Sequence, residues 1–230
     1  MNPEIYVKVT ANGPYLVYGL TKLTQKIILT NEDGVSIGYG DGKMFEIKAL
    51  PAHLCRCGQS RNAPFCDGSH LAAHFDGRET ADTTPIMQQE SADKLVGPKQ
   101  ILLDNQNYCA FARFCDRAGQ IWRLVAAGRE PELAANEANL CPSGRLVMYG
   151  KDGKSLEAKE TAQLNLLEDT GLNISGPLWL RGSIKVIGAD DIAYEVRAKQ
   201  TLCRCGQSSN KPFCDGSHAG SRYKAHYPQL

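Results

Sequence analysis

The strongest constraint on this chain is a stretch of 16 residues that occurs twice. CRCGQSRNAPFCDGSH runs from Cys55 to His70, and CRCGQSSNKPFCDGSH runs from Cys203 to His218. Fourteen of the 16 positions are identical. Because thiolates and imidazole are metal ligands, we expect two equivalent ligand sets. The candidates are Cys55, Cys57, Cys66 and His70 in the first motif and Cys203, Cys205, Cys214 and His218 in the second motif.

The repeat extends upstream of both motifs. NGPYLVYG, residues 12–19, precedes the first motif, and SGPLWLRG, residues 175–182, precedes the second. Each Gly-Pro opens an alternating stretch that predicts a β-strand. Whole structural units, and not only loops, are therefore duplicated. We expect a first unit over residues 1–80, an insert over 81–164 and a second unit over 165–230.

Further strand and turn signals occupy the two units. Pro14 lies 41 residues before its motif cysteine and Pro177 only 26, so the first unit has room for about one extra hairpin. The insert opens with a polar, breaker-rich linker and holds the best helix candidate. The expected strands are 26–30, 44–48, 184–187 and 193–197, the expected turns Asp33-Gly34, Asp41-Gly42 and Asp190-Asp191, and the expected helix 131–140.

Composition narrows the class of protein. The net charge of +1 gives no support to binding of nucleic acid or an anionic membrane, which usually needs a basic patch. No apolar run approaches a membrane span, and MNPEIYVKVT lacks the features of a signal peptide, so we expect a cytoplasmic chain without a membrane partner. Nine cysteines in a reducing compartment indicate metal binding or catalysis rather than disulfides.

The ligand spacing separates the candidate metals. Structural zinc usually uses two pairs, each spaced by two to four residues, around one ion. In the first motif a single residue separates Cys55 from Cys57, and the second pair is Cys66-Asp-Gly-Ser-His70. Such a pattern can serve a two-iron cluster, with one pair on each iron. Asp67 and Ser69 suit a helix N-terminus, which favours an anionic group.

Both motifs resemble the signature of the CDGSH iron-sulfur family, to which mitoNEET-type proteins belong. The string C-x-C-x2-S-x3-P-x-C-D-G-S-H matches at every signature position in both copies. The resemblance, to the tandem-motif prokaryotic type, implies one 2Fe-2S cluster per motif, held by three cysteines and one histidine. Single-motif relatives form homodimers with a β-rich cap. We therefore expect a β-rich α+β fold in which the two units form an intrachain pseudo-dimer, and a monomeric chain with internal pseudo-twofold symmetry.

The histidine ligand has a chemical consequence. Replacing a thiolate by neutral imidazole raises the reduction potential, as in Rieske centres. A protonated ring cannot bind iron. We therefore predict sites that are redox-active and acid-labile at His70 and His218.

Three further cysteines, Cys109, Cys115 and Cys141, lie in the insert, and Pro142 follows the last. Cysteine followed by proline as the last ligand recurs in bacterial ferredoxins. The arrangement is similar to 3Fe-4S ferredoxins and to a divergent mono-cluster ferredoxin domain, which implies a ferredoxin-like insert with a 3Fe-4S or 4Fe-4S cluster. It departs from them at Ala112, where histidine is common. The alternative is that these are buried free cysteines.

The repeat also tests other polar residues of the motifs. His74, His53 and His226 correspond to Arg222, Thr201 and Arg78, so we expect surface or supporting roles for these histidines rather than ligation. Arg56 and Arg204 are repeated. They either pair with the negative charge of the cluster or are solvated loop arginines.

Three functions compete at this stage. The first is electron transfer or redox sensing with an unknown redox partner. The second is an iron-sulfur carrier that donates clusters to an apo-protein acceptor. The third is a zinc-bound interaction module. The sequence carries no recognisable enzyme signature, so we expect no catalytic residues.

Overall fold

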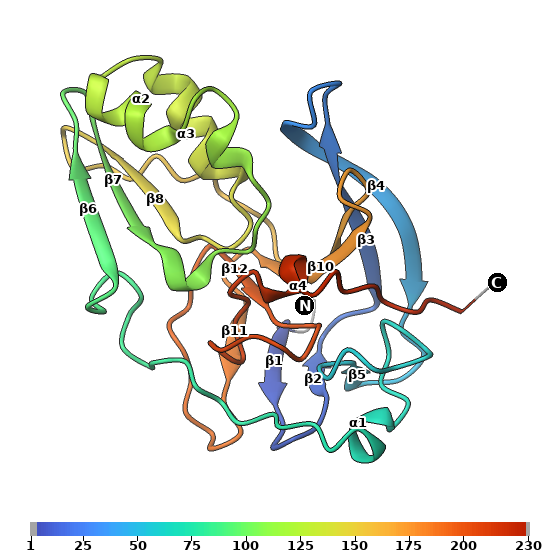
Figure 1. The fold of residues 1–230 in the computed structure, drawn as a ribbon. Coiled ribbons are helices and arrows are strands. Elements are labelled where there is room, and N and C mark those ends of the chain that lie inside the picture. The colour runs from blue at the N-terminus through green and yellow to red at the C-terminus, as the bar shows by residue number, and fades with distance from the viewer. Residues whose placement is uncertain (1–3, 229–230) are drawn as a thin grey trace.

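The computed structural model describes residues 4–228, which form a strand-rich α+β fold with three sheets (Figure 1). The first sheet has the order β11-β1-β2-β5, the second β12-β10-β9-β3-β4, and the third β6-β7-β8. The strands of the first sheet are β11 (Lys185–Ile187), β1 (Tyr6–Val9), β2 (Tyr15–Tyr18) and β5 (Ala52–Leu54). Those of the second are β12 (Lys199–Leu202), β10 (Ile174–Arg181), β9 (Gln163–Asp169), β3 (Lys22–Thr30) and β4 (Ser36–Glu46).

The two units exchange strands. β1 of the first unit pairs in parallel with β11, and β3 pairs in parallel with β9. By sequence order around the two motifs, β1, β2, β3 and β5 correspond to β9, β10, β11 and β12. The two parallel pairings are therefore the same interaction made twice, as a pseudo-twofold axis requires. This arrangement bears out the expected intrachain pseudo-dimer with a β cap.

One hydrophobic core joins the two units. The Gly-Pro segments supply β2 and β10, whose alternating apolar side chains face it. Its fully buried members come from both halves of the chain and include Val7, Val17 and Leu23 from the first and Leu166, Leu178 and Val186 from the second. Neither unit could bury these side chains alone, because each of the first two sheets contains strands of both units.

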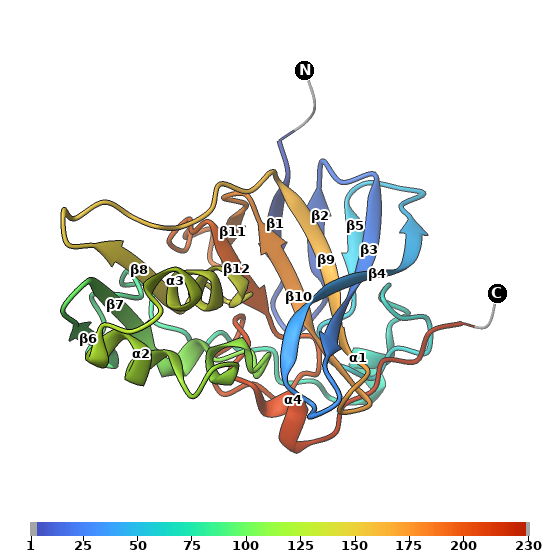
Figure 2. The same cartoon turned by 90° about the horizontal axis from the view of Figure 1, so that it is seen from above.

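The insert forms a separate layer beside β12 (Figure 2). Its sheet consists of β6 (Ala92–Val96), β7 (Gln100–Asn105) and β8 (Leu146–Gly150). Two helices, α2 (Ile121–Ala127) and α3 (Pro131–Leu140), pack on this sheet around a core that includes Leu102, Ile121 and Met148. Two 3-10 turns, η1 (Gln106–Tyr108) and η2 (Phe114–Asp116), complete it. The predicted helix over 131–140 is confirmed.

Two predicted features are wrong. Asp41-Gly42 is not a hairpin turn but lies within β4, where the pairing with β3 shifts register. A Cβ at Gly42 would lie 2.8 Å from Gln25 Cβ, so glycine here relieves crowding at a bulge. Residues 193–197 form no strand; only Ala193 bridges to Ile187. In the second unit the counterpart of the β3–β4 hairpin therefore consists only of β11 and this single bridge.

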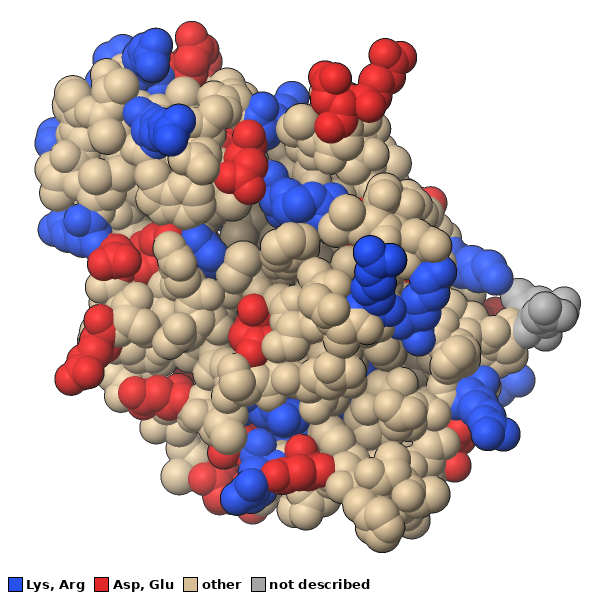
Figure 3. Space-filling view, viewed as in Figure 1, with Lys and Arg blue, Asp and Glu red and all other residues tan. Residues whose placement is uncertain are grey.

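Two turns are confirmed. Gly34 N–H donates to Asn31 O in the β3–β4 turn, and Asp191 N–H donates to Gly188 O after β11. The charged side chains of both signs are scattered over the face in Figure 3, with uncharged surface between them. None of the helices within residues 4–228 is long and apolar enough to cross a membrane.

Candidate metal centre

The first motif is a loop held between β5 and a short helix, α1 (Ser69–Ala72). Cys55 N–H donates to Pro64 O and Cys66 N–H to His53 O, which closes the loop. As predicted, Asp67 lies at the start of the helix, where its carboxylate accepts from Ser69 N–H at 3.0 Å. The ligand candidates lie in two pairs. Cys55 Sγ is 3.7 Å from Cys57 Sγ, and Cys66 Sγ is 3.4 Å from His70 Nδ1.

The second motif repeats this geometry between β12 and α4 (Ser217–Gly220). Cys203 Sγ is 3.7 Å from Cys205 Sγ, and Cys214 Sγ is 3.4 Å from His218 Nδ1. Backbone N–H groups point at the sulfurs in both copies, with Gln59 donating to Cys57 and Gln207 to Cys205 at 3.5 Å each. Such bonds stabilise thiolates and tune iron-sulfur centres.

These distances fit two metal ions per motif. A tetrahedral ion with sulfur at about 2.3 Å and nitrogen at about 2.1 Å spans about 3.8 Å between two sulfurs and about 3.6 Å between sulfur and nitrogen. Each observed pair is close to that span. Among the described residues, no three His, Cys, Asp or Glu side chains gather as a single ion would require. The donors thus fit a two-iron group better than one zinc ion.

Electrostatics favour ligation by both residue types. The hydrogen bond from Cys57 lowers the pKa of Cys55 to about 6, and the bond from Cys205 lowers the pKa of Cys203 to about 7. One thiolate of each Cys-Cys pair is therefore accessible near neutral pH, whereas burial raises the pKa of Cys66 and of Cys214 in the Cys-His pairs. Burial, with help from the Arg204 charge, lowers the pKa of His218 to about 4. The ring is neutral at physiological pH, which is the form that binds metal.

The two motifs touch each other through their glycines. Gly58 has φ +76°, and a Cβ there would lie 2.5 Å from Cys205 O. Gly206 has φ +78°, and a Cβ there would lie 2.5 Å from Cys57 O. Each glycine permits the backbone of the opposite motif to approach.

Both repeated arginines are buried, so the solvated-loop alternative is wrong. Arg56 is 2% exposed and donates to Thr10 O and Gly77 O. Arg204 is also 2% exposed and donates to Gly176 O, Leu167 O and the Glu168 carboxylate. Each guanidinium satisfies backbone carbonyls that would otherwise be buried without partners. Their first role is to hold the loops in place.

The three insert cysteines converge. Cys109 follows η1, Cys115 lies in η2 and Cys141 caps α3, and all three line one cavity with Arg145. Burial and the neighbouring thiols raise the pKa of Cys115 to about 12. The cavity is about 20 Å³, room for about one water molecule, so a larger group requires the Cys109–Cys115 loop to move outward.

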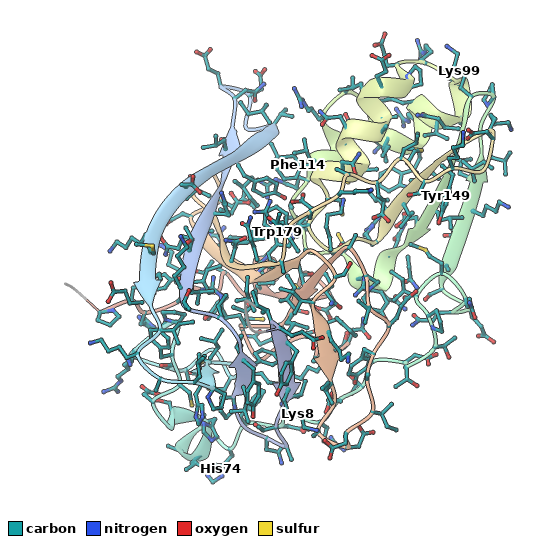
Figure 4. The ribbon with its side chains drawn as sticks, turned by 180° about the vertical axis from the view of Figure 1, so that it is seen from behind. Lys8, His74, Lys99, Phe114, Tyr149 and Trp179 are labelled. Atoms are coloured by element: carbon teal, nitrogen blue, oxygen red, sulfur yellow. The ribbon has the colours of Figure 1, made fainter. Side chains whose placement is uncertain are left out.

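The other histidines belong to neither set of candidate ligands. His74 is exposed just beyond α1, at the end of the molecule away from Lys99 and Tyr149 of the insert (Figure 4). His53 is exposed on β5, and its carbonyl accepts from Cys66 N–H. The carbonyl of His226 accepts from Ala63 N–H, so this backbone supports the first motif.

Several contacts around the sites have no signal in the sequence. Tyr15 Oη donates to Cys203 O and Pro212 O, which ties the first unit to the second motif. Tyr108 and Phe213, the residues before Cys109 and Cys214, pack with ring centroids 5.3 Å apart. Asn210 Nδ2 donates to Asn107 O of the insert at 3.1 Å. The partners are more than 100 residues apart, and no local pattern predicts such pairs.

Comparison with known proteins identifies the class. Residues 12–71 and 175–219 match the model of the family described as iron-binding zinc finger, CDGSH type. Each match contains one complete ligand set, so the fold and sites define an iron-binding protein of the iron-sulfur kind. The two units that contain these residues belong to this family, in the arrangement of a tandem CDGSH protein, and an insert separates them. No curated protein and no solved structure matches the chain.

Proposed function

We propose that the chain holds two 2Fe-2S clusters and acts in electron transfer or redox sensing. The observation that carries the proposal is the pairing of donors, Cys with Cys and Cys with His, at the same distances in both motifs. A 2Fe-2S cluster supplies reversible one-electron chemistry. The chain's own residues hold it, supply N–H donors to the sulfurs and keep His218 neutral.

The insert supports a third centre. Three thiols on one cavity match the ligand count of a 3Fe-4S cluster, with a 4Fe-4S cluster needing a fourth ligand. The Arg145 guanidinium, 2.8 Å from Asp104, adds a cation beside the thiolates. We propose that electrons pass among the three centres, and that the chain performs no catalysis of its own.

The carrier function remains the second candidate because the first motif is partly open. Cys66 and His70 are half-buried, so an acceptor protein can reach this pair. Incubation with an apo-ferredoxin separates the candidates. Transfer of iron and sulfide favours the carrier, whereas reversible reduction without loss favours electron transfer.

The test of the proposed function is EPR with iron and sulfide analysis on anaerobically purified protein. Two 2Fe-2S centres give four irons from the motifs, and a 3Fe-4S centre in the insert adds three. Cys109→Ala removes only the insert signal, whereas Cys66→Ser removes one motif signal. A colourless protein with bound zinc would refute both cluster functions.

A further inference from the structure

The two motifs, nearly identical in sequence, lie in different surroundings. We propose that the open face of the first motif, around Asn62, Phe65 and Gly68, is the docking site for the cysteine-bearing cluster loop of an external iron-sulfur protein. This proposal rests on the proposed function and names the partner class and the site of exchange. The proposal is based on the contact that the insert makes with the equivalent face of the second motif.

The insert covers one defined face of the second motif. Asn210 donates to Asn107 O, Phe213 packs on Tyr108, and a Cβ at Gly216 would lie 3.0 Å from Cys109 O. The Arg197 guanidinium lies 5.1 Å from both the Tyr108 and Phe213 ring centroids, which fixes this packing. The covering loop therefore presents a cysteine, Cys109, directly against the second motif.

The equivalent face of the first motif is uncovered. Asn62, Phe65 and Gly68 correspond to Asn210, Phe213 and Gly216. Beyond its chain neighbours, no atom of the described residues lies within 4 Å of a Cβ built on Gly68. Asn62 is exposed, and no hydrogen bond of its side chain is found among the described residues.

A groove occupies the place that the insert fills at the second motif. It has a volume of about 930 Å³, and its walls include Asn62, Phe65 and the ligand Cys66. Met44 of β4, which is 59% exposed, lines the groove with Lys43 and Glu46 of the same strand and with Lys48 beyond its end. An apolar floor with lysines at the rim suits a protein loop bearing anionic thiolates.

The candidate ligands of the first motif are also more exposed to solvent than those of the second motif. His218 is 4% exposed and Cys214 is 2% exposed, whereas His70 and Cys66 are only half-buried. A partner approaching from solvent therefore reaches the first motif and not the second. In the exchange, one electron leaves the reduced cluster of the partner and enters the first motif. No bond forms or breaks, and both ligand sets are retained.

The experiment uses the loaded full chain and reduced plant-type 2Fe-2S ferredoxin as the probe. The probe has a lower reduction potential than histidine-ligated 2Fe-2S centres, so electron transfer from the probe to the chain is downhill. Asn62→Trp fills the groove, and Ile192→Trp, at an exposed position of the second unit away from both motifs, is the matched control. Stopped-flow absorbance should show reduction slowed roughly tenfold by Asn62→Trp and little changed by the control. Equal rates in both variants would overturn the proposal.

A second measurement compares chains that keep one motif loaded. Cys214→Ser retains the first motif, and Cys66→Ser retains the second. EPR of samples frozen during the reaction should show the first motif reduced much faster than the second. Faster or equal reduction of the second motif, or no reaction of the loaded chain with the probe, contradicts the docking site. Absence of iron and sulfide in the wild-type chain instead contradicts the proposed function itself.

Discussion

At the scale of single residues, two glycines allow the backbones of the two motifs to contact each other. Gly58 and Gly206 both have positive φ, and each lies against a carbonyl oxygen of the other motif. A side chain at either position adds backbone strain and a steric clash. Because each contact involves the residue after a candidate ligand, a displacement there moves the ligand loop.

We predict that Gly58→Ala destabilises the protein more than a glycine substitution with the same backbone strain alone. Gly34 is the matched control, since its φ is +78° and a Cβ there meets no described atom within 4 Å. Strain alone costs about 1–2 kcal/mol, and the clash at Gly58 adds to it. Thermal unfolding of both variants checks the difference. Equal losses of stability would show that the motifs separate freely.

Glu137 introduces a pH dependence into the insert. The side chain is fully buried in α3, where the Ala118 backbone N–H and the Arg117 charge offset only part of the cost of ionising the carboxyl group. Burial raises the pKa of Glu137 to about 7. In the unfolded chain the carboxyl ionises at its ordinary pKa. Stability therefore falls as pH rises from the ordinary range of glutamate through about 7.

Glu137→Gln should remove this loss. The expected gain above about pH 7 is on the order of 3 kcal/mol, from roughly 1.4 kcal/mol per unit of pKa. The measurement is the unfolding midpoint of the two proteins between about pH 4 and pH 8. Glu132→Gln, an exposed change on the same helix, is the control. Parallel pH profiles for Glu137→Gln and the wild-type chain would contradict the prediction.

At the scale of elements, β12 anchors the insert. Lys199 is buried, and its Nζ donates to Ala138 O at 3.2 Å and Asn139 O at 2.9 Å, at the carboxyl end of α3. A cation there also complements the helix dipole. Arg113 of the insert pairs with Asp169 of β9 at 2.6 Å. Tyr39 of β4 lies between Phe114 and Trp179, which Figure 4 labels.

We predict that Lys199→Met loosens α3 from the second unit. Two helix carbonyls lose their partner, at a cost of about 1–3 kcal/mol each where they stay buried. Hydrogen exchange of the backbone amides of residues 137–141 should accelerate. Lys185→Met, at an exposed position of β11, should leave these rates unchanged. Unchanged exchange in Lys199→Met would mean that the remaining contacts suffice to hold the helix.

Elements with local signals were predictable from the sequence. Proline at the first turn marked α3, and Gly-Pro marked β2 and β10. Asp41-Gly42 misled because the signal for a tight turn and the signal for a glycine bulge are the same. The pairing of the four candidate ligands in each motif was predictable from their spacing. The docking of the insert on the second motif was not, since it depends on side chains brought together only by the folded chain.

At the scale of the whole molecule, the exchanged strands make the two units interdependent. β3 completes the sheet of the second unit, and β11 completes the sheet of the first. We predict that a protease site introduced in the exposed segment 151–156 leaves the cleaved pieces associated. Size-exclusion chromatography under native conditions should give one peak containing both pieces. Separation of the pieces would show that the parallel pairings contribute little.

The covalent link between the exchanged halves has a consequence for concentration. Two free single-motif chains must meet to form a dimer, so their assembly weakens on dilution. Here each half finds the other within the same chain, so the pairing of the two motifs does not depend on the concentration of the protein. The number of paired motifs then follows the number of chains made, whether the cell makes few or many.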